Sequence, residues 1–132
     1  MIIASTKLST LSKYKIRKIS NIILKFCQET FGVGRNKLYP MFSLSYKDNT
    51  GLFGEYDGVE NLITIYVKEC KTISMLTSTI IHEWTHSKQN IIGKYNKLLK
   101  KFGYENHPME IEARETEKKW NRKALNYMKK NL

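Results

Sequence analysis

The sequence predicts an α+β fold in a single domain that covers residues 1–132. Segments with helical periodicity dominate both ends of the chain, whereas short strand-like segments are confined to positions 41–67. Helices and strands that are segregated along the chain are typical of α+β proteins. A chain of 132 residues, 41% of them hydrophobic, suits one domain with one core.

The first predicted helix begins at Ser9 or Thr10 and runs to about Phe31. A hydroxyl side chain is favoured at a helix start because its oxygen accepts a hydrogen bond from the first turn. Gly32 and Gly34 then end the helix. Its buried side includes hydrophobic residues at helical spacing: Ile16, Ile19, Ile23, Phe26 and Cys27.

Three predicted strands follow, and we expect them to form a small antiparallel sheet. Residues 41–46 alternate in hydrophobicity. Residues 51–56 and 62–67 flank the segment Asp-Gly-Val-Glu-Asn at 57–61, which suits a hairpin turn. The run Leu-Ile-Thr-Ile-Tyr-Val at 62–67 is rich in β-branched residues and is the strongest of the three strand predictions.

The second half of the chain is predicted to be helical. One helix covers 72–89, with Thr72 at its start, and a short amphipathic helix over 90–103 connects it to the next, with Gly103 as C-cap. The last helix begins at Pro108, because proline fits a first helical turn. Its apolar stripe at helical spacing consists of Met109, Ala113, Trp120, Ala124 and Tyr127.

The helix over 72–89 contains the pattern H-E-x-x-H, from His82 to His86. Residues four apart share a helix face, so both imidazoles can bind one metal ion with Glu83 beside them as a general base. Most of the remaining circumference is apolar, which predicts a buried helix. Buried polar groups need partners, and a metal ion supplies one. The alternative is a pair of hydrogen-bonded core histidines.

A catalytic zinc ion usually has three protein ligands, so a third must come from elsewhere in the chain. Glu110 and Glu112 flank the apolar stripe of the last helix at similar angles, and geometry does not choose between them. Either carboxylate can instead serve only to stabilise the positive end of the helix dipole. His107 is a further alternative, although a residue directly before Pro108 is more simply explained as a helix cap.

The H-E-x-x-H motif followed by E-x-E-A, beginning at Glu110, resembles the gluzincin metallopeptidases, in particular the ImmA/IrrE-type enzymes, over about residues 72–120. The resemblance implies a minimal zincin-like fold, a Zn²⁺ cofactor, Glu110 as third ligand and a protein or peptide substrate. The chain departs from the family at Arg114, where an acid or amide often orients a ligand histidine. A resemblance to SprT-like proteases would instead make His107 the third ligand.

The same resemblance implies catalytic roles. Glu83 would accept a proton from the attacking water and pass it to the leaving amine. Many enzymes of this kind add a tyrosine hydroxyl that stabilises the oxyanion, and Tyr104 is the donor predicted here. Tyr95 also lies between the two motifs and is a second candidate for this donor. Amphipathic packing is the alternative for both tyrosines and is the favoured explanation for Tyr95. Gln89 shares the histidine side of its helix and is predicted to line the cleft.

The formal net charge is +11, and most of it comes from lysine. A positive field attracts nucleic acid, so a second hypothesis is a basic nucleic-acid-associated protein with a structural zinc ion or a SprT-like protease site. Lysine without interleaved arginine and aromatic residues is more simply explained as a solvated surface. The cations fall into three clusters, at positions 7–18, 94–101 and 118–130.

Cysteine usage and hydropathy indicate a cytoplasmic protein. Cys27 and Cys70 have no C-x-x-C spacing and are predicted to be reduced thiols. No apolar run is long enough to span a bilayer, and residues 1–4 are too few for the core of a signal peptide. We therefore expect no association with a membrane.

Overall fold

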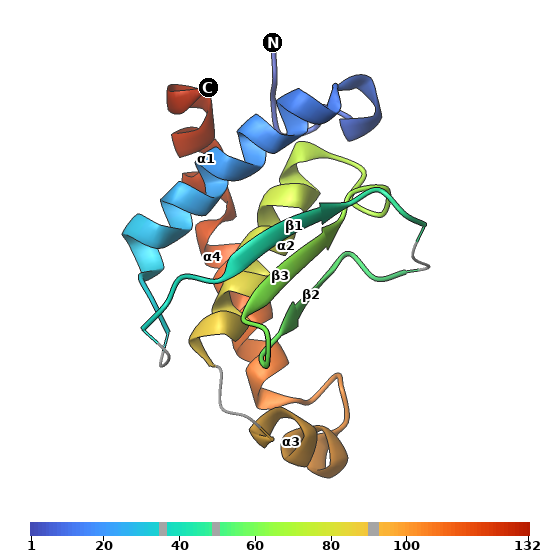
Figure 1. Ribbon diagram of the computed structural model, residues 1–132, viewed down its shortest axis with the longest axis vertical. Helices are drawn as coiled ribbons and strands as arrows, with labels where there is room; N and C mark the ends of the chain where they lie inside the picture. Colours follow the sequence, from blue (N-terminus) through green and yellow to red (C-terminus); the bar gives the residue numbers. More distant parts are fainter. Residues whose placement is uncertain (35–36, 49–50, 90–92) are drawn as a thin grey trace.

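The computed structural model describes residues 1–34, 37–48, 51–89 and 93–132, and it confirms the α+β class (Figure 1). A short 3₁₀ turn and a long helix precede the strands, and the remaining helices follow them. The elements are η1 (Leu8–Thr10), α1 (Lys13–Phe31), β1 (Met41–Ser45), β2 (Gly54–Asp57), β3 (Leu62–Tyr66), α2 (Ile73–Lys88), α3 (Lys94–Phe102) and α4 (Pro108–Asn131).

Helix α1 begins later than the sequence predicted. Ser9 and Thr10 belong to η1, and the N-cap is Ser12, whose side chain accepts a hydrogen bond from the backbone N–H of Lys15. The buried Leu8 anchors η1 in the core, so the 3₁₀ turn does not continue into the helix. The predicted end is confirmed, because Gly32 is the C-cap with a φ of 71°, a conformation that suits glycine.

The three strands form a mixed sheet in the order β1-β3-β2, so the prediction of an antiparallel sheet is wrong in part. The predicted hairpin is confirmed: β2 and β3 are antiparallel, and the Asp57 carboxylate accepts hydrogen bonds from two backbone N–H groups of the turn. Strand β1, however, pairs with β3 in parallel. Strand β2 lies between β1 and β3 in the sequence, but β3 lies between β1 and β2 in the sheet. The chain therefore forms β2 in the opposite direction to β1 and turns back through the hairpin, so that β3 runs parallel to β1.

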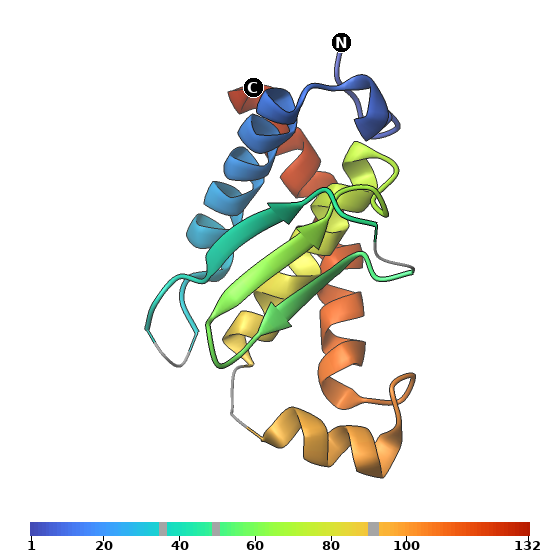
Figure 2. The ribbon, with the colours of Figure 1, turned by 45° about the vertical axis from the view of Figure 1, so that its right-hand side comes forward.

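Helix α2 lies between the sheet and α4, as Figure 2 shows. Its predicted cap is confirmed, because the Thr72 hydroxyl accepts from the N–H of Met75. The buried residues of α1, β3, α2 and α4 form one hydrophobic cluster, and Trp84 of α2 is 1% exposed. The Trp84 indole N–H donates to the carbonyl of Gly32 at 3.1 Å, which fixes the end of α1 against α2. The motif helix is therefore anchored in the core.

A close backbone contact also fixes the far end of α2. Gly34 lies so near this helix that a Cβ atom there would be 2.3 Å from the carbonyl oxygen of Ser87. Helix α3 is different, since none of its residues is buried and it lies at the end of the molecule away from both termini (Figure 1). The predicted Gly103 C-cap is confirmed, whereas the predicted start of this helix at positions 90–92 lies outside the described residues.

None of the helices in the described ranges combines the length and the apolar character that a membrane span requires.

Candidate metal centre

Helix α2 turns His82 and His86 toward one side of the molecule. The ring centroids are 4.9 Å apart, and the side chains are 14% and 11% exposed. Both rings lie on the polar side of α2, and the opposite side carries the buried Leu76, Ile80 and Trp84. The four-residue spacing therefore does what the sequence predicted and presents two imidazoles together at the edge of the core.

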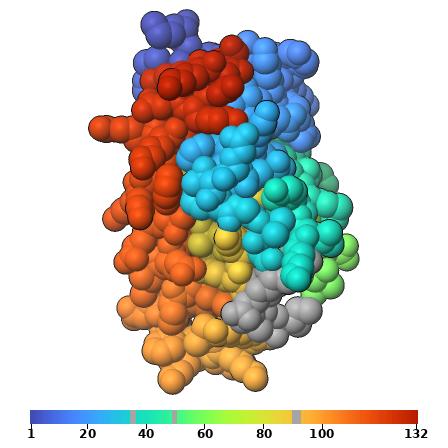
Figure 3. All heavy atoms as spheres, turned by 90° about the vertical axis from the view of Figure 1, so that its left-hand side faces the viewer, coloured from blue at the N-terminus to red at the C-terminus, as the bar shows by residue number. Residues whose placement is uncertain are grey.

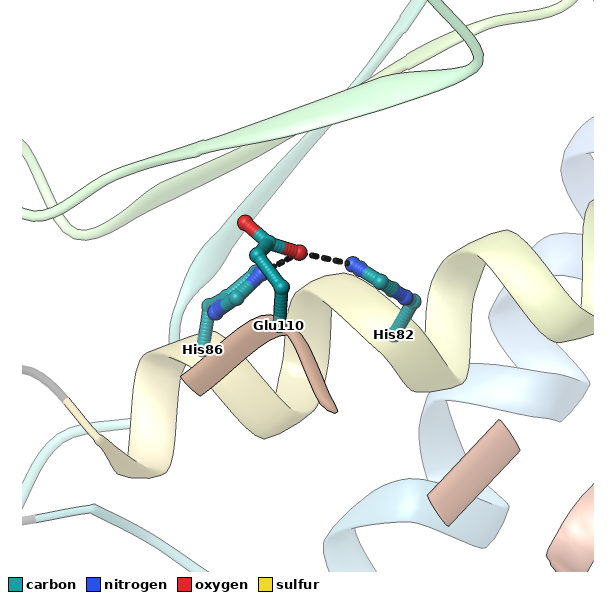
Figure 4. Close-up of side chains that lie close together, drawn as sticks. All are labelled: His82, His86 and Glu110. Carbon is teal, nitrogen blue, oxygen red and sulfur yellow. Dashed lines mark hydrogen bonds and ion pairs between the residues drawn. The ribbon is translucent and has the colours of Figure 1, made fainter. Parts of the chain in front are cut away.

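Glu110 meets both imidazoles from the first turn of α4 (Figure 4). Its Oε1 atom lies 2.9 Å from Nε2 of His82 and 3.1 Å from Nε2 of His86. The Glu110 carboxylate is buried, and all three ligand atoms lie within 4.8 Å of one another. Ligand atoms about 2.1 Å from a tetrahedral zinc ion are roughly 3.4 Å apart, so the observed spacing is close to that of a zinc site.

The outward nitrogens of the two imidazoles are held by acceptors. Nδ1 of His82 donates to Oε2 of Glu117 at 2.8 Å, and Nδ1 of His86 donates to Oε1 of Gln89 at 2.8 Å. The amide of Gln89 is fixed in this orientation because its Nε2 donates to the carbonyl of Met109 and to Glu112. With the proton at Nδ1, each neutral imidazole presents a lone pair at Nε2.

The Nε2 lone pairs of both neutral imidazoles would thus face the same carboxylate oxygen of Glu110 and repel it, unless a positive charge lies among the three atoms. Protons on both Nε2 atoms would provide this charge, but they would make two adjacent imidazoles cationic. The pKa of His82 reflects this need for positive charge. Burial acts to lower that pKa, but hydrogen bonds to Glu110 and Glu117 outweigh burial and raise it to about 10. Burial also acts to raise the pKa of Glu110, but the two imidazoles hold it well below its usual range. A divalent cation satisfies the same three atoms with neutral imidazoles.

The structure distinguishes the three predicted alternatives for the third ligand. Glu110 joins the histidines, as the resemblance implied, whereas the exposed Glu112 accepts a hydrogen bond from Gln89 instead. His107 is the N-cap of α4: its Nδ1 accepts from the N–H of Met109 and its Nε2 donates to the carbonyl of Tyr95. Because both of its nitrogens are occupied, His107 is not placed to act as a ligand.

Glu83 lies within the cleft that contains the two histidines. This cleft has a volume of about 460 Å³. The Glu83 side chain is buried, and this burial raises its pKa to about 7, although the nearby imidazoles oppose the shift. A carboxylate with a pKa near neutrality suits a general base. The cleft is lined by strand β2, helices α2 and α3, the segment between α3 and α4, and the start of α4. The lining residues include Glu55, Tyr56, His82, Glu83, His86, Gln89, Tyr95, Tyr104 and Glu110.

Tyr95 is a site residue for which the sequence analysis favoured packing over a role as oxyanion donor. Its hydroxyl donates to Oε2 of Glu110 at 2.5 Å, and its ring stacks on His107 with the centroids 4.1 Å apart. This hydrogen bond occupies Oε2 of Glu110, so that Oε1 is the oxygen that faces the two histidines. Nothing in the sequence around Tyr95 distinguishes it from other aromatic residues of amphipathic helices, because its role depends on how α3 docks onto α4.

Glu117 is the second residue that the sequence analysis did not identify. Glu117 accepts the hydrogen bond from His82 that the gluzincin resemblance would assign to an acid or amide at position 114. Arg114 instead donates to the carbonyl of Glu105. A signal for it was present, because residues seven apart share a helix face and Glu117 follows Glu110 by seven. Gln89, by contrast, was correctly predicted to line the cleft.

Tyr104, the predicted oxyanion donor, lines the cleft but is 54% exposed. Partial burial, and then the negative charge of Glu110, raise its pKa above the usual value, so its hydroxyl keeps its proton at neutral pH. The structure thus brings together His82, Glu83, His86 and Glu110 and leaves Tyr104 at the rim of the cleft.

Comparison with protein-family models, with curated protein sequences and with solved structures gives no match. The chemistry of the site is therefore judged from its own side chains.

Proposed function

We propose that this chain is a zinc-dependent peptidase of the gluzincin type, with His82, His86 and Glu110 as the zinc ligands. The observation that carries the proposal is the convergence of two imidazole nitrogens on one carboxylate oxygen, with the outward nitrogens held by acceptors. Two nitrogen donors and one oxygen donor match the ligand set of catalytic zinc sites, which keep a further position open. When bound, zinc would act as a Lewis acid that polarises the scissile carbonyl and lowers the pKa of water.

Glu83 performs the proton transfers in this proposal. It accepts a proton from the attacking water and then gives that proton to the leaving amine. Its position supports the role, because it directly follows a ligand and lines the same cleft. Tyr104 is the proposed donor to the oxyanion, because its hydroxyl lies at the rim of the cleft and is not held by Glu110 as that of Tyr95 is.

The edge of the sheet supports a peptide as the substrate. Strand β2 is an edge strand, and the N–H of Tyr66 donates to the carbonyl of Phe53, so these two residues form a hydrogen-bonded pair across the hairpin. In an antiparallel ladder, hydrogen-bonded pairs alternate with pairs whose backbone N–H and C=O groups point away from each other. Gly54 and Tyr56 therefore direct their backbone N–H and C=O groups away from β3, and both residues line the cleft. An extended peptide could pair with this edge and cross the site.

Gly54 has a second role in this geometry. A Cβ atom at this position would lie 2.8 Å from Cγ2 of Thr79, a β-branched side chain one turn before His82. The absence of a side chain lets β2 approach α2, so that the edge strand and the metal ligands share one cleft.

Buried, unpaired cysteines favour a reducing compartment, which supports a cytoplasmic location in this proposal. Cys27 and Cys70 are free and fully buried, and burial raises the pKa of Cys70 to about 11. Thiols of this kind persist where disulfides do not form.

The proposal is tested by turnover of a mixture of quenched fluorescent peptides by the zinc-loaded protein. Glu83→Gln should lower kcat/KM by about 10²- to 10⁴-fold, the usual contribution of a general base, and leave zinc affinity unchanged. Glu115→Gln is the matched control, because Glu115 is exposed on the outer side of α4. Equal activity of Glu83→Gln and wild type, or no cleavage of any peptide by the zinc-loaded wild type, would reject the proposal.

A further inference from the structure

Helix α1 and the C-terminal half of α4 lie next to each other on one face of the molecule, as Figure 3 shows. The ring of Phe26 in α1 is 6.3 Å from that of Trp120 and 5.5 Å from that of Tyr127, both in α4. The Tyr127 hydroxyl also donates to Glu29 at 3.3 Å. The two helices therefore share a continuous surface, which we call the α1–α4 face.

The charge of this face is predominantly positive, and Glu29, which accepts the hydrogen bond from Tyr127, is the acidic residue that α1 adds at the seam. Residues 13–28 and 118–132 contain none of the 12 acidic residues of the chain. They hold nearly half of its 23 lysine and arginine residues, and these cations are exposed except for the half-buried Lys15. The cations are Lys13, Lys15, Arg17, Lys18, Lys25, Lys118, Lys119, Arg122, Lys123, Lys129 and Lys130. Two of them, Lys13 and Arg17, lie over the rings of Tyr46 and Phe42 on the β1 side of α1, so the other nine form the charge of the face.

These cations have no carboxylate partners. Within the described ranges, none of them lies within 4.0 Å of an Asp or Glu oxygen. Lys119 and Lys123 instead lie over the ring of Trp120, with the Lys123 ammonium 4.6 Å from its centroid. Like charges that are not neutralised repel one another, and a polyanion that replaces their counterions relieves the repulsion.

The cations form one row on each helix. Lys119, Lys123 and Lys130 share the side of α4 that carries Trp120 and Tyr127, the residues that contact α1. On α1, Lys18 and Lys25 are seven residues apart, so they share one side of the helix. The row on α4 from Lys119 to Lys130 spans about 17 Å. A duplex of that length carries roughly ten phosphate charges.

We propose that the α1–α4 face binds the phosphate backbone of double-stranded nucleic acid without reading its sequence. The proposal does not depend on the peptidase activity, because none of these cations lines the cleft. The surface chemistry favours nucleic acid over an anionic membrane. Insertion into lipid needs an exposed apolar face, and the exposed large hydrophobic side chains within residues 13–28 and 118–132 are only Tyr14 and Leu132, one near the start of α1 and the other after the end of α4, which form no apolar stripe.

The test is the fluorescence anisotropy of a labelled short DNA duplex titrated with the protein over a range of salt concentrations. The variant Lys119→Gln/Lys123→Gln/Lys130→Gln removes the row on α4. It should weaken binding by at least about tenfold at low salt and make the slope of log K against log salt shallower by about 2.7, since each phosphate contact contributes about 0.9. Circular dichroism would verify that the variant is folded.

The control variant Lys97→Gln/Lys100→Gln/Lys101→Gln makes the same change in net charge on α3, which lies at the other end of the molecule (Figure 1). Its affinity and salt slope should stay close to those of wild type. Equal losses in the two variants would mean diffuse attraction by net charge and would overturn the proposal. So would no binding of the wild type to the duplex at low salt, or binding to phosphatidylserine vesicles alone.

Discussion

Glu117 should control the affinity of the metal centre without being a ligand. Its carboxylate accepts the Nδ1–H of His82 at 2.8 Å, and the two side chains are only 27% and 14% exposed. A hydrogen bond to a charged group contributes about 1.5–3 kcal/mol. Glu117→Ala should therefore weaken zinc binding by roughly 10- to 100-fold, the range found for groups that orient ligand histidines. Competition with a chromophoric zinc chelator measures this loss directly.

A graded pair of variants separates charge from orientation. Glu117→Gln keeps an oxygen that can accept from His82 but removes the negative charge, so its loss of affinity should be smaller than that of Glu117→Ala. Glu115→Gln is the control, because it removes a carboxylate from the exposed side of the same helix. If Glu117→Ala bound zinc as tightly as Glu115→Gln, the assigned hydrogen bond would have no role in the site.

Two further predictions concern Tyr95 and Gly34. Tyr95→Phe removes the hydrogen bond to Oε2 of Glu110 but keeps the ring that stacks on His107. Its zinc affinity should fall by about tenfold with little change in Tm, and an unchanged affinity in the chelator assay would contradict the role assigned to the hydroxyl. Gly34→Ala places a Cβ atom 2.3 Å from the Ser87 carbonyl oxygen, which belongs to the backbone and cannot rotate away. Urea denaturation should show a destabilisation of about 1–3 kcal/mol, and a variant as stable as wild type would disprove this close contact.

Local signals in the sequence predicted the helices and the hairpin well. Thr72 caps α2, Gly32 and Gly103 end their helices, and the turn between β2 and β3 lies where the Asp-Gly dipeptide indicated. The parallel pairing of β1 was not predictable from the same signals. Alternation shows which residues form a strand, but the choice of a neighbour depends on how the whole sheet packs on α2.

The candidate metal centre likewise combines residues that local spacing predicts with residues that only the tertiary packing brings together. His82, Glu83 and His86 follow from one helical turn and were predicted from spacing alone. The choice of Glu110 over Glu112 required the crossing of α2 and α4, which turns one carboxylate to the histidines and the other to Gln89. The supporting contacts from Tyr95 and Glu117 likewise join elements that are distant in sequence.

The most direct test of the metal centre is metal analysis of the purified protein combined with X-ray absorption at the zinc edge. One zinc ion per chain is the expected result, bound by two imidazoles and one carboxylate and completed by a ligand that is not from the protein. His82→Ala and Glu110→Ala should each lose the metal while remaining folded. A fourth protein ligand, or a chain that binds no stoichiometric metal when zinc is supplied, would contradict the assignment.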